Sequence, residues 1–256
     1  MRSLLCGPLP FVTRDPRLAK PGIVWTIEGV ERASVRRVAV SPEELNAVHV
    51  DVLDEEWILS EGQVRSLLDY ICRQEGVSRS VYPFLVTLTE GALRPSEARS
   101  LRVRGFASRS DGSGELTVCY RGQARVVPLR PRFATFLRGW IDEAGLQEDD
   151  LLFPGPCGGQ LRVAAYARLW KQAQEAVLPH DELLSWRSGE SVDILRESSL
   201  VRWLRLGLDV ATVAELAGVG PAWLALRYPY CFRLEAIEID WERLAQETRL
   251  PEPTAR

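Results

Sequence analysis

Histidine, cysteine and lysine are scarce in this sequence of 256 residues, although they supply many of the metal ligands and proton donors of proteins. The two histidines are His49 and His180, and none of the five cysteines lies at metal-ligand spacing from another cysteine or a histidine. We therefore expect no structural zinc site and no bound cofactor. An odd number of scattered cysteines also indicates a reduced, cytoplasmic protein without a disulfide framework.

Long apolar runs are also missing. No stretch approaches the ~20 apolar residues that span a bilayer, so we expect no membrane association. The first ten residues contain a single basic residue and a short apolar run that Gly7 and two prolines interrupt, which is not the pattern of a secretory signal. With 46% hydrophobic and 26% charged residues, the chain has the composition of a globular protein with a sizeable core.

Among the 32 basic residues, only Lys20 and Lys171 are lysines, and all the others are arginines. Arginine makes planar, two-pronged contacts with phosphate that lysine cannot make, although a GC-rich genome produces the same bias. The 35 acidic residues leave a formal net charge of −3, whereas nucleic-acid-binding domains usually carry a basic excess. Composition alone therefore leaves DNA binding open.

The spacing of apolar residues predicts a mixed α+β fold that is mainly helical, with one small antiparallel β element. Ser60 followed by Gln63 is a capping-box signature that begins an amphipathic helix. Two β-type runs, 116–120 and 125–129, flank a turn and predict a hairpin. Further helices are expected at 81–90, from Pro95, at 133–144, 164–176 and 194–206, from Asp209 to Gly218, at 221–228 and at 234–244.

These patterns predict three parts of the chain. Residues 1–55 have weak periodicity and are expected to form an N-terminal arm or small subdomain. Residues 56–232 are expected to form the main domain, and residues 233–256 a C-terminal helix and tail.

Several motifs of the main domain resemble those of the tyrosine recombinase (phage integrase) family in both order and spacing, over roughly residues 57–245. They are Gly91-Ala-Leu-Arg94-Pro-Ser-Glu97-Ala, the predicted hairpin ending in Arg125-Val-Val-Pro-Leu, Leu152-Phe-Pro, Leu169-Trp-Lys-Gln-Ala, Ile194-Leu-Arg196, Gly207-Leu-Asp209, Ala217-Gly-Val219 and Tyr228. The resemblance implies the fold of that family's catalytic domain.

The resemblance also implies a chemistry. In the family, a tyrosine oxygen attacks a DNA phosphate and leaves a phosphotyrosine and a free 5′ hydroxyl, and no metal is required. Tyr228 would be the nucleophile, and Arg94 and Arg196 would hold the nonbridging oxygens. A free phenol has a pKa of about 10 and is a weak nucleophile at neutral pH, so the arginines would have to stabilise the charge that grows in the transition state.

The sequence departs from the family pattern at the positions that transfer protons. The hairpin has no lysine, and Arg121 at its turn is a poor proton donor because a guanidinium hardly ever deprotonates. Asp193 and Val219 stand where the family has histidines. His180 is the one residue that could replace them as an acid or a phosphate ligand, although an ordinary surface histidine fits its position as well. Losing one acid–base group typically costs roughly 10²–10⁴ in rate, so we expect a degenerate active site.

Two other classes of function fit parts of the sequence. Residues 209–228 also resemble a helix-turn-helix, whose second helix, near 221–228, would read a major groove; it carries a single arginine, Arg227. The last predicted helix has an apolar stripe of Leu234, Ile237, Trp241 and Leu244, which suits packing on its own domain or on another subunit. A protein-interaction module that reuses the recombinase fold is therefore the third hypothesis.

The hypothesis that accounts for the most residues is a DNA-binding, tyrosine-recombinase-like protein that is weakly active or inactive in strand cleavage. Its expected partners are double-stranded DNA and, through the C-terminal helix, a second copy or a partner recombinase. As the proteins of this family take part in DNA recombination and integration, the same role is implied for this chain.

Overall fold

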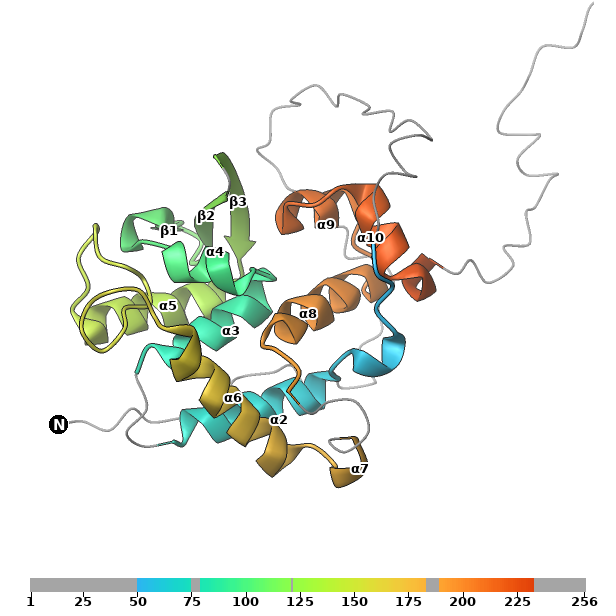
Figure 1. Cartoon of the computed structure of the whole chain (residues 1–256). Coiled ribbons are helices and arrows are strands. Elements are labelled where there is room, and N and C mark those ends of the chain that lie inside the picture. Colours follow the sequence, from blue (N-terminus) through green and yellow to red (C-terminus); the bar gives the residue numbers. More distant parts are fainter. Residues whose placement is uncertain (1–49, 75–78, 121, 183–188, 233–256) are drawn as a thin grey trace, which may run out of the picture.

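The computed structural model describes residues 50–74, 79–120, 122–182 and 189–232 (Figure 1). Most of the expected N-terminal arm and all of the last expected helix lie outside these residues. The helices are η1 (Glu55–Trp57), α2 (Glu61–Cys72), α3 (Val81–Gly91), α4 (Pro95–Ser100), η2 (Val103–Gly105), α5 (Pro131–Ala144), α6 (Val163–Val177), α7 (His180–Glu182), α8 (Asp193–Arg205), α9 (Val210–Ala217), α10 (Pro221–Arg227) and η4 (Pro229–Phe232). The strands are β1 (Phe106–Ser108), β2 (Gly114–Tyr120) and β3 (Gln123–Leu129).

The fold is mainly helical with one small antiparallel sheet, as the sequence predicts. The capping box is formed: the Ser60 hydroxyl accepts a hydrogen bond from the Gln63 backbone N–H, and the Gln63 side chain accepts one from the Ser60 backbone N–H. Asp209 caps α9 by accepting from the Thr212 backbone N–H at 3.0 Å. Helix α5 begins at Pro131, two residues before the prediction, because proline suits a first helical turn.

The sheet has three strands, one more than the sequence predicts. Strands β2 and β3 form the predicted antiparallel hairpin, with Leu116 opposite Val127. Strand β1 pairs with the other edge of β2. Gly114 begins β2 where a Cβ atom would lie 2.9 Å from the Ala134 side chain and 3.0 Å from the Ala107 carbonyl oxygen. The backbone therefore approaches α5 more closely than any larger residue permits.

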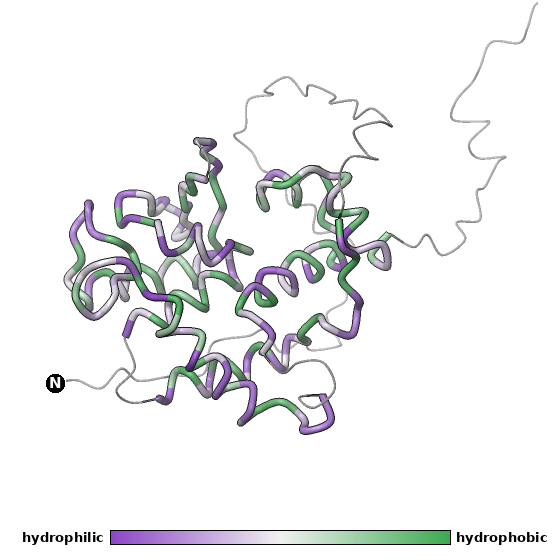
Figure 2. The backbone as a smooth tube through the Cα atoms, viewed as in Figure 1, coloured by the Kyte–Doolittle hydropathy of each residue, from purple (hydrophilic) through white to green (hydrophobic). Residues whose placement is uncertain are grey.

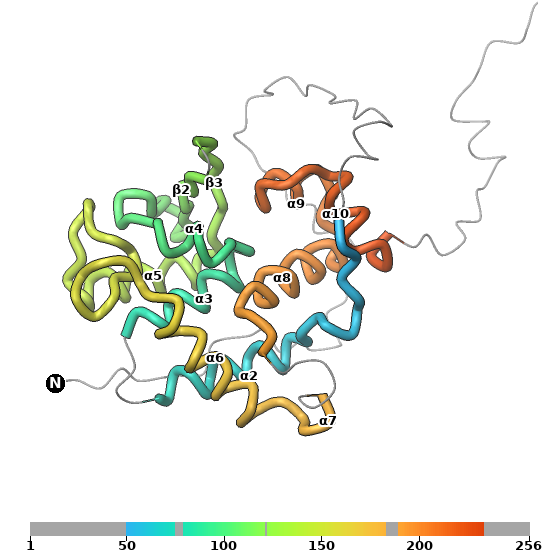
Figure 3. Tube along the Cα trace, in the orientation of Figure 1, coloured from blue at the N-terminus to red at the C-terminus, as the bar shows by residue number. Residues whose placement is uncertain are grey.

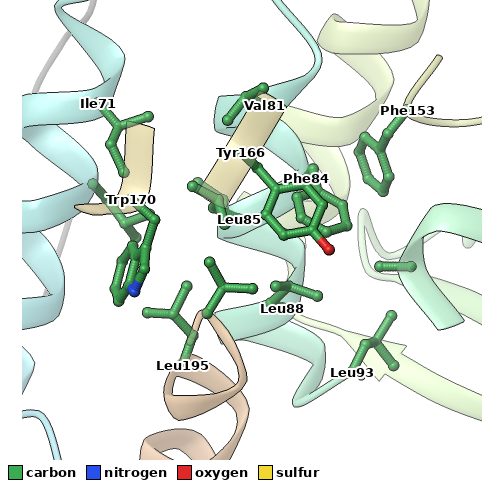
Figure 4. Packing of buried hydrophobic residues seen from close by; sticks show 14 of the residues in the cluster. Ile71, Val81, Phe84, Leu85, Leu88, Leu93, Phe153, Tyr166, Trp170 and Leu195 are labelled. Carbon is green, nitrogen blue, oxygen red and sulfur yellow. The ribbon is translucent and has the colours of Figure 1, made fainter. Parts of the chain in front are cut away.

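The main core lies between α2, α3, α6 and the sheet. Figure 4 shows Phe84 of α3 beside Tyr166 of α6 and Phe153, with Trp170 and Leu195 on the other side of the cluster. The Phe84 ring lies 4.9 Å from that of Tyr166 and 5.9 Å from that of Phe153. Figure 2 shows how hydropathy varies along the backbone: α3 is mostly hydrophobic, whereas the short α7 is hydrophilic.

A second cluster of buried residues joins α8, α9 and α10. It contains Ala92, Leu200, Val201, Leu204, Val213, Ala214, Ala217, Leu224 and Tyr228. Ala92, which follows α3, has a left-handed backbone (φ 46°) and sits in this cluster. The second cluster therefore places the turn before α4 next to the helices that carry the other candidate residues.

Three cysteines of the described residues, Cys119, Cys157 and Cys231, are free thiols. Within the described ranges, no helix has both the length and the apolar character needed to cross a bilayer.

Candidate functional site

Glu97 is the centre of the candidate site. It lies in the first turn of α4 and is almost fully buried, with 1% of its side chain exposed. The Arg125 guanidinium of β3 donates two parallel hydrogen bonds to its carboxylate, at 2.9 and 2.8 Å, and the Arg94 backbone N–H donates a third at 2.9 Å. Arg125 also donates to the Leu216 carbonyl of α9 at 2.8 Å. The pair of Glu97 and Arg125 thus ties α4, β3 and α9 together.

Burial alone would raise the pKa of the Glu97 carboxyl. The hydrogen bonds from Arg125 and from the Arg94 backbone, together with the charges of Arg125 and Arg196, outweigh that effect and lower the pKa. Glu97 is therefore ionised at neutral pH.

Arg196 of α8 lies behind Glu97, with 3% of its surface exposed. Its two terminal nitrogens donate to the carbonyls of Ala92 and Ala217, the latter at 2.8 Å, and one of them lies 3.9 Å from the Glu97 carboxylate. Burial lowers its pKa to about 10, so the side chain is still a cation at neutral pH. Arg196 fixes the turns that precede Arg94 and Val219 and supplies a buried positive charge.

Arg94, at the N-terminal end of α4, is half-buried, and its guanidinium lies over the Tyr120 ring, 5.0 Å from the centroid. Among the described residues, no carboxylate lies within ion-pair distance of this guanidinium. Its charge is close enough to lower the pKa of Arg196, which places the two cations in one region. Arg94 is thus the cation of the cluster that can take an anion from outside.

Tyr228 follows α10 and has no exposed surface. Its hydroxyl donates a hydrogen bond to the Glu197 carboxylate of α8, and its ring packs edge-on against Trp223 at 6.0 Å. Burial and the neighbouring Glu197 carboxylate raise the pKa of this phenol far above its usual value near 10, although Arg196 opposes the shift. In this structure the phenol is protonated and sealed from solvent.

The structure thus brings Arg94, Arg196 and Tyr228 to one region. Arg196 lies close to both of the others: the charge of Arg94 acts to lower the pKa of Arg196, and the charge of Arg196 acts to lower the pKa of Tyr228.

The two positions that depart from the family pattern have ordinary structural roles. Asp193 is the exposed first residue of α8, and its carboxylate accepts a hydrogen bond from the Ser191 hydroxyl at 2.8 Å. Val219 packs against the second cluster directly after Gly218, whose left-handed backbone (φ 64°) ends α9. Neither side chain carries the imidazole that the family has at these positions.

His180 does not join the cluster. His180 begins the short helix α7, whose Glu182 accepts hydrogen bonds from Gln63 of α2. Figure 1 shows α7 beside α2, at the end of the molecule opposite the hairpin and α9. Arg121 lies outside the described residues.

The predicted second helix of a helix-turn-helix is present as α10, but its one arginine is used internally. Arg227 donates to the Glu197 carboxylate at 3.4 Å and to the Asp51 carbonyl at 2.6 Å. The exposed residues of α10 are Pro221, Ala225 and Leu226. None of their side chains could hydrogen-bond to a base edge.

Sequence reasoning missed Glu197. It directly follows Arg196, yet its partner Tyr228 is 31 residues away, and no local periodicity links the two. The one available signal was the placement of charges: an acid follows the predicted second arginine, and a base, Arg227, precedes the predicted tyrosine.

Neither a protein-family model nor a curated protein matches the chain. Solved structures do. The XerH site-specific recombinase bound to its difH substrate, in a pre-cleavage complex, shares 20% identity at a TM-score of 0.51, and the match covers 63% of this chain and 46% of that chain. The XerA recombinase shares 14% identity at a TM-score of 0.53, with 78% of this chain and 66% of that chain covered.

A third similar structure is the Tn1549 transposon integrase in complex with transposon right end DNA, at 16% identity and a TM-score of 0.53. The match covers 80% of this chain and 70% of that chain. The described part of this chain thus has the fold of the tyrosine recombinases. It spans about half the length of the XerH chains that it matches.

Proposed function

We propose that this chain is a DNA-binding relative of the tyrosine recombinases, of the kind that act in DNA recombination and integration, and that it cleaves strands weakly or not at all. The observation that carries the proposal is the contrast within one site. Arg94 presents a cation without a carboxylate partner among the described residues, whereas Tyr228 is buried against Glu197.

Arg94 would bind the DNA phosphate directly. A guanidinium matches two phosphate oxygens at once, and binding to an unneutralised arginine does not require an existing ion pair to break. Arg196 would act from behind through its charge, because both of its terminal nitrogens already donate to carbonyls. Arg121, at the hairpin turn, is proposed as a further phosphate contact.

Cleavage would be limited by both geometry and chemistry. Attack requires the Tyr228 oxygen to reach a phosphorus atom, and in this structure the oxygen is covered. The leaving 5′ oxygen also needs a proton, and Asp193 and Val219 stand in place of the histidines that assist proton transfer in the family. The expected result is a protein that holds DNA and seldom forms a phosphotyrosine.

The remaining parts of the proposal concern the wider protein. Residues 56–232 would form the DNA-binding domain, and residues 233–256 would dock on a second copy or on a partner recombinase that supplies the missing proton donors. Such a protein would work in the cytoplasm.

Fluorescence anisotropy of mixed duplexes at two salt concentrations tests the proposal. Phosphate contacts release counterions, so the affinity should fall steeply as salt increases. A helix-turn-helix regulator would also bind with salt dependence, but would show high selectivity for one duplex without any covalent product. Absence of binding at low salt would contradict both DNA hypotheses and favour a protein-interaction module.

A further inference from the structure

The Tyr228 hydroxyl is held by a chain of contacts that reaches an N-terminal segment of the structure. The hydroxyl donates to Glu197, and the same carboxylate oxygen accepts from the Nε of Arg227 at 3.4 Å. Glu197 and Arg227 are themselves largely buried, with 15% and 20% of their side chains exposed. Glu197 thus fixes the phenol, and Arg227 in turn fixes Glu197.

Arg227 is bonded to residues that precede α2. Its Nη1 donates to the Asp51 carbonyl at 2.6 Å, and its own carbonyl accepts from the Leu53 backbone N–H at 3.0 Å. We call residues 51–59 the strap. Figure 3 shows the strap, in blue, passing α10 and running along α8 before α2 begins.

The strap is attached to α8 at two further places. Glu55 forms an ion pair with Arg205, and the Leu59 backbone N–H donates to the Ser198 hydroxyl at 3.0 Å. Leu53 packs against both hydrophobic clusters. The strap therefore crosses the two helices that carry Glu197 and Arg227 and holds them in one arrangement.

We propose that Glu197, Arg227 and the strap form an autoinhibitory latch that keeps Tyr228 away from DNA, and that release of the strap exposes the tyrosine. The inference rests on the proposed function, because a latch on Tyr228 matters only if that phenol reacts. It assigns to Glu197 a positioning role that the recombinase motifs do not include.

The same contact could instead make Glu197 the base that takes the proton from Tyr228. Two observations favour the latch. The tyrosine has no exposed surface, so no phosphorus atom can approach its oxygen while the contact exists. The Glu197 carboxylate beside the nucleophile would also repel the phosphate and the charge that develops on it.

The latch can be tested without DNA by acetylation of the full chain with N-acetylimidazole. The reagent transfers its acetyl group to an exposed phenol oxygen, imidazole leaves, and the phenol proton passes to solvent. Peptide mass spectrometry compares Tyr228 with Tyr70, a half-exposed tyrosine of α2 that serves as the internal reference. The variants are Glu197→Ala and Arg227→Ala. Glu215→Ala, on the exposed side of α9, is the matched control.

The latch predicts that Tyr228 is protected in the wild type and in Glu215→Ala, and that it reacts at least tenfold faster in either latch variant. Circular dichroism identifies the variants that fold, and one folded latch variant is sufficient. Continued protection of Tyr228 in every folded latch variant would overturn the proposal.

A second experiment separates failure of the latch from failure of the proposed function. In the DNA duplex, sulfur replaces the bridging 5′ oxygen at one phosphate. The tyrosine O–P bond then forms, the phenol proton passes to solvent, the P–S bond breaks, and a 5′ thiolate leaves without needing a proton donor. The latch predicts a higher yield of covalent adduct with Glu197→Ala than with the wild type. Faster acetylation without adduct in any variant supports the latch and contradicts the nucleophile. Adduct from the wild type that is lost in Glu197→Ala would make Glu197 the base and overturn the latch.

Discussion

Arg125 and Glu97 form a two-pronged ion pair in the interior of the protein, with hydrogen bonds of 2.9 and 2.8 Å between β3 and α4. The side chains are 13% and 1% exposed. Because Arg125 also bonds to α9 and Glu97 bonds to the Arg94 backbone, the pair positions the guanidinium that we propose to bind DNA.

Removal of one partner of this pair should be costly. Arg125→Ala leaves a buried carboxylate without its main partner, and breaking a buried pair in this way costs roughly 3–5 kcal/mol. Urea denaturation measures the loss. The control is Arg104→Ala, since Arg104 pairs with Asp149 at 64% exposure and should cost less than about 1 kcal/mol. Equal losses for the two variants would show that the buried pair has no special role.

The same pair predicts how stability depends on pH. The folded state lowers the pKa of Glu97 below its ordinary value of 4.5, so the unfolded chain binds a proton first as the pH falls. The stabilisation from Glu97 is therefore complete above about pH 4.5 and is lost as the pH falls through the lower folded value. Urea midpoints recorded from neutral pH downward should fall less steeply for Glu97→Gln than for the wild type. Parallel curves would contradict the assignment.

Gly218 should tolerate no side chain. Its φ of +64° is unfavourable for other residues, and a Cβ would lie 2.9 Å from the Arg125 Nη1. Gly218→Ala should destabilise the protein by about 1–2 kcal/mol and loosen the contact between β3 and α9. Gly139→Ala is the opposite control, because this glycine is inside α5 with free space around it and alanine should stabilise the helix by roughly 0.5–1 kcal/mol. Thermal unfolding of the two variants gives the comparison, and a stable Gly218→Ala would show that the turn can shift.

Tyr228→Phe tests the nucleophile. The substitution removes only the hydroxyl, so any covalent DNA adduct should disappear while duplex affinity stays within about twofold, since no DNA contact is assigned to this buried ring. Denaturing gel electrophoresis detects the adduct, and Tyr70→Phe is the control. An unchanged adduct yield from Tyr228→Phe would assign the chemistry to another residue.

Local features of the fold could be predicted because each has a local cause. Ser60 with Gln63 and Asp209 with Thr212 lie within one turn of each other, and their helices begin where the sequence predicts. Strand β1 was missed because three residues carry too little alternation to be recognised.

The candidate site likewise has one part that the sequence predicts and another that depends on tertiary packing. Resemblance of motifs was enough to select Arg94, Arg196 and Tyr228, which the structure brings to one region. The bond between Tyr228 and Glu197 depends on how α10 packs on α8, and the attachment of Arg227 to Asp51 joins residues 176 positions apart. Tertiary packing decides such contacts, and the spacing within a single element does not reveal them.

The most direct test of the account compares the salt dependence of duplex binding for the wild type and Arg94→Ala, with Arg73→Ala at the exposed end of α2 as the control. Removing one phosphate contact should weaken binding to all sequences alike and reduce the slope of log affinity against log salt by about 1. The account predicts that change for Arg94→Ala and an unchanged slope for Arg73→Ala. The same slope for the wild type and Arg94→Ala would contradict the central claim that Arg94 holds a DNA phosphate.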